Sequence, residues 1–114
     1  MLKGIDVNEV VEFVSSQDKS DNPTVFLIRN ITMRSKMSLF KGAIDKQGQV
    51  DITVLQERAI DIFKAGIKGI KNLGGKDYDA IDDALIDSIP MVTMIEVVGK
   101  ILECNFASES ETKN

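Results

Sequence analysis

One run of apolar, largely β-branched residues constrains the fold of this chain more than any other feature. It follows Pro23 and covers residues 24–31, which read Thr-Val-Phe-Leu-Ile-Arg-Asn-Ile. β-Branched and aromatic side chains fit a pleated surface better than a helix. We therefore predict a strand over 24–31, and its nearly continuous apolar character indicates burial on both faces.

A second strand is the prediction that we favour for residues 7–15. Positions 10–15 alternate between two faces, as in a strand, although Asp6 and Glu9 form a helix-capping pair and the valines at 7, 10, 11 and 14 fit a helical stripe. The β-branched run favours the strand, because valine loses side-chain freedom in a helix. Paired with 24–31 across the polar loop 16–23, it predicts a β-hairpin.

Two helices are expected in the middle of the chain. Thr32 can cap the first, whose apolar residues are Met33, Met37, Phe40 and Ile44. Asp51 and Thr53 offer caps for the second. Gly66 and Gly69 either allow close contact with another helix or fray the C-terminal turn of this one. Its apolar side is predicted to carry Leu55, Ala59, Ile62, Phe63, Gly66 and Ile70, and the sequence Asn-Leu-Gly-Gly at 72–75 is the expected helix stop.

The remainder predicts a short acidic helix within 77–88 and a last helix beginning at Pro90, where a missing N–H costs nothing. Because Ile95 and Val98 are assigned to its buried side, we expect an aspartate at either position to unfold the domain. The predicted apolar face of this last helix consists of Met91, Met94, Ile95, Val98, Ile101 and Leu102.

The predicted fold class is therefore α+β, with an N-terminal β-hairpin followed by three to four packed helices. At 114 residues the chain is the size of one domain. We expect residues 1–106 to form a single compact domain. Residues 107–114 are small, polar and charged, and we expect a disordered C-terminal tail there.

Composition restricts the chemistry. The chain has no histidine and only one cysteine, Cys104, which excludes imidazole bases, Cys–His nucleophiles and thiolate metal cages within one chain. The aspartates after residue 76 do not match a calcium loop, because Asp82 and Ser88 stand where Gly and Glu are required. We expect no metal, no cofactor and no enzymatic activity.

Charge and hydropathy restrict the partners. The net charge is −4, with basic residues concentrated in 29–46 and 58–76 and aspartates in 77–87. Ordinary solvated faces are the interpretation that we favour. The alternatives are a domain that pairs its own charged faces and one that docks on a complementary partner. The low pI of 4.8 and the few aromatics argue against nucleic-acid binding. No apolar run suits a membrane span, and the first residues lack the apolar core of a secretory signal, so we expect folding in the cytosol.

Six residues on the two methionine-bearing helices are candidates for partner contact, since methionine side chains adapt to varied surfaces. Core packing is the interpretation that we favour for them, and partner contact is the alternative. The candidates are Met33, Met37, Phe40, Met91, Met94 and Ile95.

The order of features resembles small tail-module proteins of tailed bacteriophages, in particular the tail assembly chaperone type. The resemblance covers nearly the whole chain in layout, on short segments. These are V-V-E-F-V at 10–14, P-T-V-F-L-I-R at 23–29, A-G-I-K-G-I-K-N at 65–72, I-P at 89–90, K-I-L-E at 100–103 and K-N at 113–114.

The resemblance implies binding without catalysis: such a chaperone coats the tape-measure protein in the host cytoplasm until tail-tube subunits polymerise. No binding residue of the family is carried over to this chain. Three alternatives remain open: a head–tail connector or tail-completion protein that forms a homo-oligomeric ring in the virion, an interaction module unrelated to phages, and an enzyme.

Overall fold

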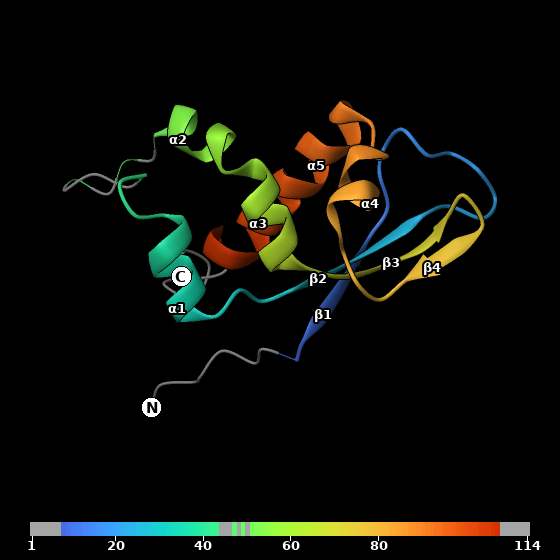
Figure 1. Cartoon of the computed structure of the whole chain (residues 1–114), viewed down its shortest axis with the longest axis horizontal. Helices are drawn as coiled ribbons and strands as arrows, with labels where there is room; N and C mark the ends of the chain where they lie inside the picture. The colour runs from blue at the N-terminus through green and yellow to red at the C-terminus, as the bar shows by residue number, and fades with distance from the viewer. Residues whose placement is uncertain (1–7, 44–46, 48, 50, 108–114) are drawn as a thin grey trace.

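The computed structural model describes residues 8–43, 47, 49 and 51–107 of the chain. These residues form a four-stranded antiparallel sheet with helices, so the predicted α+β class is confirmed (Figure 1). Residues 1–7 and 108–114, which include most of the predicted tail, lie outside the described residues. Ala107, assigned above to the tail, is instead the last residue of a π-helical turn, η1 (Glu103–Ala107).

The predicted hairpin is confirmed. Strand β1 (Val10–Phe13) pairs antiparallel with β2 (Val25–Arg29), with Phe13 opposite Phe26. The strand interpretation of 7–15 is therefore correct over the four residues of β1. Phe26 and Ile28 are buried while Val25 and Leu27 are half-buried, so β2 is covered more completely on one face than on the other.

A second hairpin was missed by the sequence prediction. Helix α3 (Ala59–Gly66) does not continue through Ile70 but ends where β3 (Ile67–Leu73) begins, and β4 (Lys76–Tyr78) follows. The expected helix stop at 72–75 is instead the turn between these strands, with positive φ at Asn72, Gly74 and Gly75. Glycine suits a helix end and a hairpin turn equally well, so the local pattern did not distinguish them.

Pairing with β2 decides the strand conformation of this segment. Ile70 lies opposite Phe26 and Ile67 opposite Ile28, and all four side chains are buried. Gly69 sits against the next strand, because a Cβ built there would lie 2.8 Å from the carbonyl oxygen of Tyr78. The sheet order is β1-β2-β3-β4, which places the missed hairpin beside the predicted one.

Three of the described helices begin at a residue whose side chain caps them. Thr32 caps α1 (Met33–Leu39) and Asp51 caps α2 (Ile52–Glu57), as predicted, and Asp82 caps α4 (Asp83–Asp87). Pro90 precedes the last helix, α5 (Met91–Leu102), which runs directly into η1. The acidic segment 77–88 therefore contributes to β4 before it forms the predicted short helix.

The core lies between one face of the sheet and helices α3, α4 and α5, which Figure 1 shows together on that side. The rings of Phe26 and Phe63 meet edge to face, with centroids 6.4 Å apart. Helices α3 and α5 approach closely at Gly66, where an added Cβ would lie 2.5 Å from Cγ2 of Ile101. The expectation that Gly66 allows close helix contact is thus confirmed.

Several basic side chains bind backbone carbonyls at helix ends. The ammonium of Lys36, which is buried, donates to the carbonyl of Asn105 at 3.0 Å. Arg58 donates to the carbonyl of Lys41 at 2.7 Å, and Arg29 donates to that of Ala65 at 2.9 Å. Helix carbonyls near a C-terminus lack intrahelical donors and carry partial negative charge. Part of the basic charge in 29–46 and 58–76 therefore joins elements of the fold.

Candidate functional site

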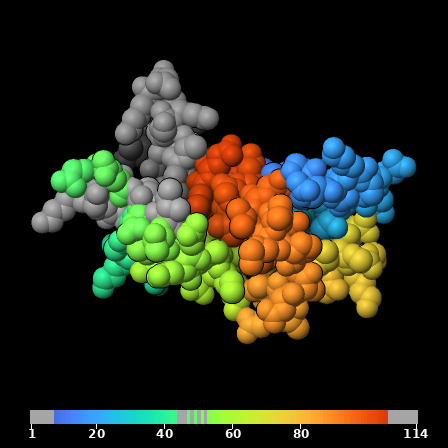
Figure 2. All heavy atoms as spheres, turned by 90° about the horizontal axis from the view of Figure 1, so that it is seen from above, coloured from blue at the N-terminus to red at the C-terminus, as the bar shows by residue number. Residues whose placement is uncertain are grey.

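An apolar groove of about 720 Å³ lies between the α2–α3 segment and the outer side of α5. Figure 2 shows the helical side of the molecule, with α3 in yellow-green beside α5 in red and orange. We refer to this apolar groove as the α5 groove. The described residues that line it are Leu55, Gln56, Ala59, Ile60, Ile86, Asp87, Ile89, Met91, Met94, Ile95, Val98, Gly99 and Leu102.

Large apolar side chains of the α5 groove are open to solvent. Met91 is 77% exposed, Ile95 is 65% exposed, and Ile60 on the facing helix is 51% exposed. Isolated exposed apolar residues are common on protein surfaces, whereas contiguous ones that line a concave surface are typical of binding sites. The groove is therefore the surface on which we place the candidate site.

Helix α5 forms this surface because it is apolar on more than one side. Val97 and Ile101 are fully buried towards the core, and Val98 is nearly so. Since most residues of α5 are apolar, the face directed inward could not be read from spacing alone. The predicted buried face included Met91 and Ile95, which are exposed, and omitted Val97. The expectation that Ile95→Asp unfolds the domain assumed that Ile95 is buried, and that assumption is wrong.

The six sequence candidates fall into two places. Met91, Met94 and Ile95 lie together in the α5 groove, with Met94 half-buried. Met33 and Met37 lie on α1 and are exposed, and Phe40 is buried in the core. Core packing is thus correct for Phe40 and wrong for four of the candidates, Met33, Met37, Met91 and Ile95. Partner contact by the exposed residues stays a prediction.

The burial of Lys36 explains the orientation of α1. Its ammonium reaches Asn105, whose side-chain oxygen accepts from the backbone N–H of Ile31 at 2.8 Å and whose side-chain amide donates to the carbonyl of Ile101 at 2.8 Å. A buried lysine requires such partners, since a charge without them is costly. With Lys36 and Phe40 directed inward, Met33 and Met37 on the same short helix are left outside.

Asp87 is the charged side chain among the described residues that line the α5 groove, and Gln56 is the uncharged polar one. Residues such as Leu55, Ala59 and Leu102, which no partner prediction included, complete the apolar lining. They lie on α2, α3 and α5, and their spacing along the two predicted helices carried a core pattern. The sequence therefore offered no signal that these helices face each other across an open groove.

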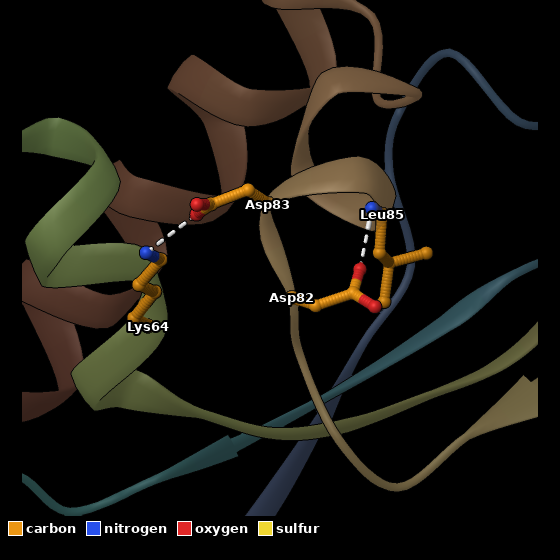
Figure 3. A network of polar contacts seen from close by, with 4 residues as sticks. All are labelled: Lys64, Asp82, Asp83 and Leu85. Atoms are coloured by element: carbon orange, nitrogen blue, oxygen red, sulfur yellow. Dashed lines mark hydrogen bonds and ion pairs between the residues drawn. The ribbon is translucent and has the colours of Figure 1, made fainter.

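A salt bridge joins α3 and α4 beside the groove. Nζ of Lys64 on α3 lies 2.7 Å from Oδ1 of Asp83 on α4 (Figure 3). The neighbouring Asp82 caps α4, because its carboxylate accepts from the backbone N–H of Leu85. The hydrogen bond between the pair raises the pKa of Lys64 and lowers that of Asp83. Each partner stands four residues from a groove residue, Ile60 and Asp87 respectively. The pair therefore holds α4 against α3 beside the groove.

The flank of α5 is attached to the loop between β1 and β2. The carboxylate of Glu96 accepts from the backbone N–H of Ser16 at 2.8 Å and from the Ser16 hydroxyl. These bonds, with a further one from the Ser15 hydroxyl, lower the pKa of Glu96 below its ordinary value of 4.5. The loop itself is organised by Asp18, which accepts from Ser20 and Thr24.

Reactive chemistry has little support in the described part of the chain. No group of three or more Cys, Asp or Glu side chains there is placed to hold a metal ion. Burial raises the pKa of the Cys104 thiol, which keeps it protonated at neutral pH and weakly nucleophilic. What the described residues do present is an open apolar groove.

Within the described residues, each helix is too short or too polar to cross a membrane. Comparison of the chain with protein-family models, with curated proteins and with solved structures finds no match to any of them.

Proposed function

We propose that this chain is a non-enzymatic binding protein whose α5 groove receives an amphipathic helix of another protein. The observation that carries the proposal is the exposure of Met91 and Ile95 on α5, opposite Ile60 on α3, within one concave apolar surface. Amphipathic helices bind such grooves by laying their apolar face into them. The resemblance to tail assembly chaperones makes a helix of a tape-measure protein the proposed partner.

Burial of the exposed groove side chains supplies the driving force. Removing apolar surface from water contributes about 25 cal/mol per Å². Methionine adds adaptability, because Met91 and Met94 can change shape to fit successive turns of a long helix. A chaperone that coats a repetitive helical protein needs a surface that accepts related segments, and an aliphatic, methionine-containing groove meets this need.

The chain's own C-terminal segment is a poor alternative occupant. Residues 108–114 read Ser-Glu-Ser-Glu-Thr-Lys-Asn and contain no apolar side chain. Their acidic residues would also lie near Asp87, which has the same charge. Residues 108–114 therefore do not supply the apolar face that this groove requires.

Two matched variants test the proposal. Ile95 lines the groove and is 65% exposed, whereas Val92 on the same helix is 60% exposed and is not among the lining residues. Each is changed to Asp and co-expressed with a helical segment of a tape-measure protein. We expect Ile95→Asp to abolish solubilisation of that segment and Val92→Asp to preserve it. Equal solubilisation by both variants would contradict the proposal.

A ring-forming connector is the second candidate, favoured by the separate exposed pair Met33 and Met37 on α1. Two different apolar surfaces on one subunit are what a head-to-tail ring contact requires. Light scattering after size exclusion, over about a hundredfold range of concentration, distinguishes the two functions. A discrete ring of fixed mass supports the connector, and a monomer or small oligomer supports the chaperone.

A further inference from the structure

Gly99 occupies an interior position of α5 that no contact among the described residues explains. It lines the α5 groove, and a Cβ built on it would meet no atom within 4 Å. Gly66 on the neighbouring helix differs, because Ile101 fills the space where its Cβ would be. An interior glycine makes a helix less stable than alanine would. At Gly99 this loss is therefore not offset by any packing that the described residues show.

The position of Gly99 relates it to the exposed side chains of the groove. Met91, Ile95 and Gly99 are spaced by four residues and so form one ridge along α5. Two large side chains stand on this ridge, followed by a gap at Gly99 where the backbone itself is accessible. Such a gap lets a second helix approach α5 more closely than any other residue would allow.

The charge of the groove indicates what the approaching helix carries. Asp87 is the charged side chain among the described lining residues, and no lysine or arginine accompanies it there. The basic residue of the facing helix α3, Lys64, is already bound to Asp83. A helix with basic residues beside its apolar face therefore complements the groove, whereas an acidic helix would be repelled.

We propose that the α5 groove is specific for a basic amphipathic helix that crosses α5 at Gly99. This inference rests on the proposed function and adds the charge of the partner and its point of closest approach. The lysines or arginines of the partner lie next to Asp87. Its apolar side chains contact Met91, Ile95 and Ile60.

The test uses two synthetic peptides of about 18 residues, or roughly five helical turns. Both carry leucine on one face, with lysine in all other positions of the first and glutamate in those of the second. Fluorescence anisotropy measures their binding to the full-length chain. We expect the Leu/Lys peptide to bind at least about tenfold more tightly than the Leu/Glu peptide, and Asp87→Asn to reduce this difference.

Gly99→Ala tests the crossing point. We expect it to raise the melting temperature of the chain, yet to weaken binding of the Leu/Lys peptide at least about tenfold, because the added methyl group separates the two helices. Val92→Ala is the matched control. It also increases the helix propensity of α5 but lies off the groove, so binding should be unchanged.

Equal binding of the Leu/Lys peptide to wild type and Gly99→Ala would overturn the crossing point. A lower melting temperature of Gly99→Ala would do the same, since it would reveal an internal role for this glycine. Equal binding of both peptides would overturn the charge preference. If Ile95→Asp still abolished peptide binding after either of these results, the proposed function of the groove would stand. If neither peptide bound the wild-type chain, the inference would be overturned. That result would also count against the proposed function.

Discussion

The two sides of α5 differ in how completely they are packed. On the inner side Val97 and Ile101 are fully buried, and Ile101 occupies the space above Gly66 so closely that no further carbon fits. On the outer side Met91 and Ile95 are exposed, and Gly99 has open space where a side chain would be. One apolar helix thus contributes both to a filled core and to an open groove, and only packing distinguishes its two sides.

The largest expected effect on stability comes from a charge placed on the inner side of α5, compared with the same charge on its outer side. Val97→Asp should destabilise the chain by about 3 to 5 kcal/mol, because the carboxylate would be buried without a partner. Ile95→Asp should change stability by less than about 1 kcal/mol, because water still solvates the charge. Chemical denaturation measures both. Similar losses for the two variants would mean that the outer side is also part of the core.

Adding a methyl group at Gly66 should produce the next largest effect. We expect Gly66→Ala to lower the free energy of unfolding by about 1 to 3 kcal/mol, because its Cβ would overlap the side chain of Ile101. Gly66→Ala combined with Ile101→Val is the informative control, since the smaller side chain should recover part of the loss. If Gly66→Ala alone were neutral, the contact between α3 and α5 would be looser than the distances indicate.

A methyl group added at Gly99 should change the free energy of unfolding in the opposite direction. Gly99→Ala is expected to raise the free energy of unfolding by up to about 1 kcal/mol, because alanine favours the helix and meets no neighbouring atom. Thermal and urea unfolding of the two alanine variants side by side compare the inner and outer sides directly. A destabilised Gly99→Ala would remove the difference between them.

The smallest expected effect is on the pH dependence of stability, and it concerns Glu96 on the flank of α5. Hydrogen bonds from Ser16 and Ser15 lower the pKa of Glu96 in the folded chain. A depressed carboxyl pKa stabilises the fold above the ordinary value of 4.5, and this contribution is lost as pH falls through the folded value.

Glu96→Gln should therefore unfold with a weaker dependence on pH below about 4.5 than wild type. Some dependence should remain, because hydrogen bonds also lower the pKa of Asp18 and of Asp83. Denaturation midpoints measured at several acidic pH values would detect the difference. Identical profiles for the variant and wild type would show that the contact with Ser16 does not persist in solution.

Local chemistry was sufficient for a large part of the fold. The β-branched residues of β2, the caps at Thr32 and Asp51, and the start of α5 after Pro90 were all predicted from residues adjacent in sequence. Each depends on the conformational preference of a short segment or on a side chain that reaches its own backbone. Such features do not require knowledge of the rest of the molecule.

The second hairpin and the α5 groove were decided by residues distant in the sequence. Residues 67–73 form a strand because β2 provides a partner for them, although their sequence also fits a helix. Met33 and Met37 are exposed because Lys36 is held inside by Asn105, which lies 69 positions later.

By itself, the sequence determined the α+β class, the first hairpin and the positions where several helices begin, since these follow from local preferences. Only the tertiary structure decided which side of α5 is buried. A helix that is apolar on several sides has no intrinsic inner face, and the close contact of Ile101 with Gly66 selects one. The apolar residues left on the other side then form the groove.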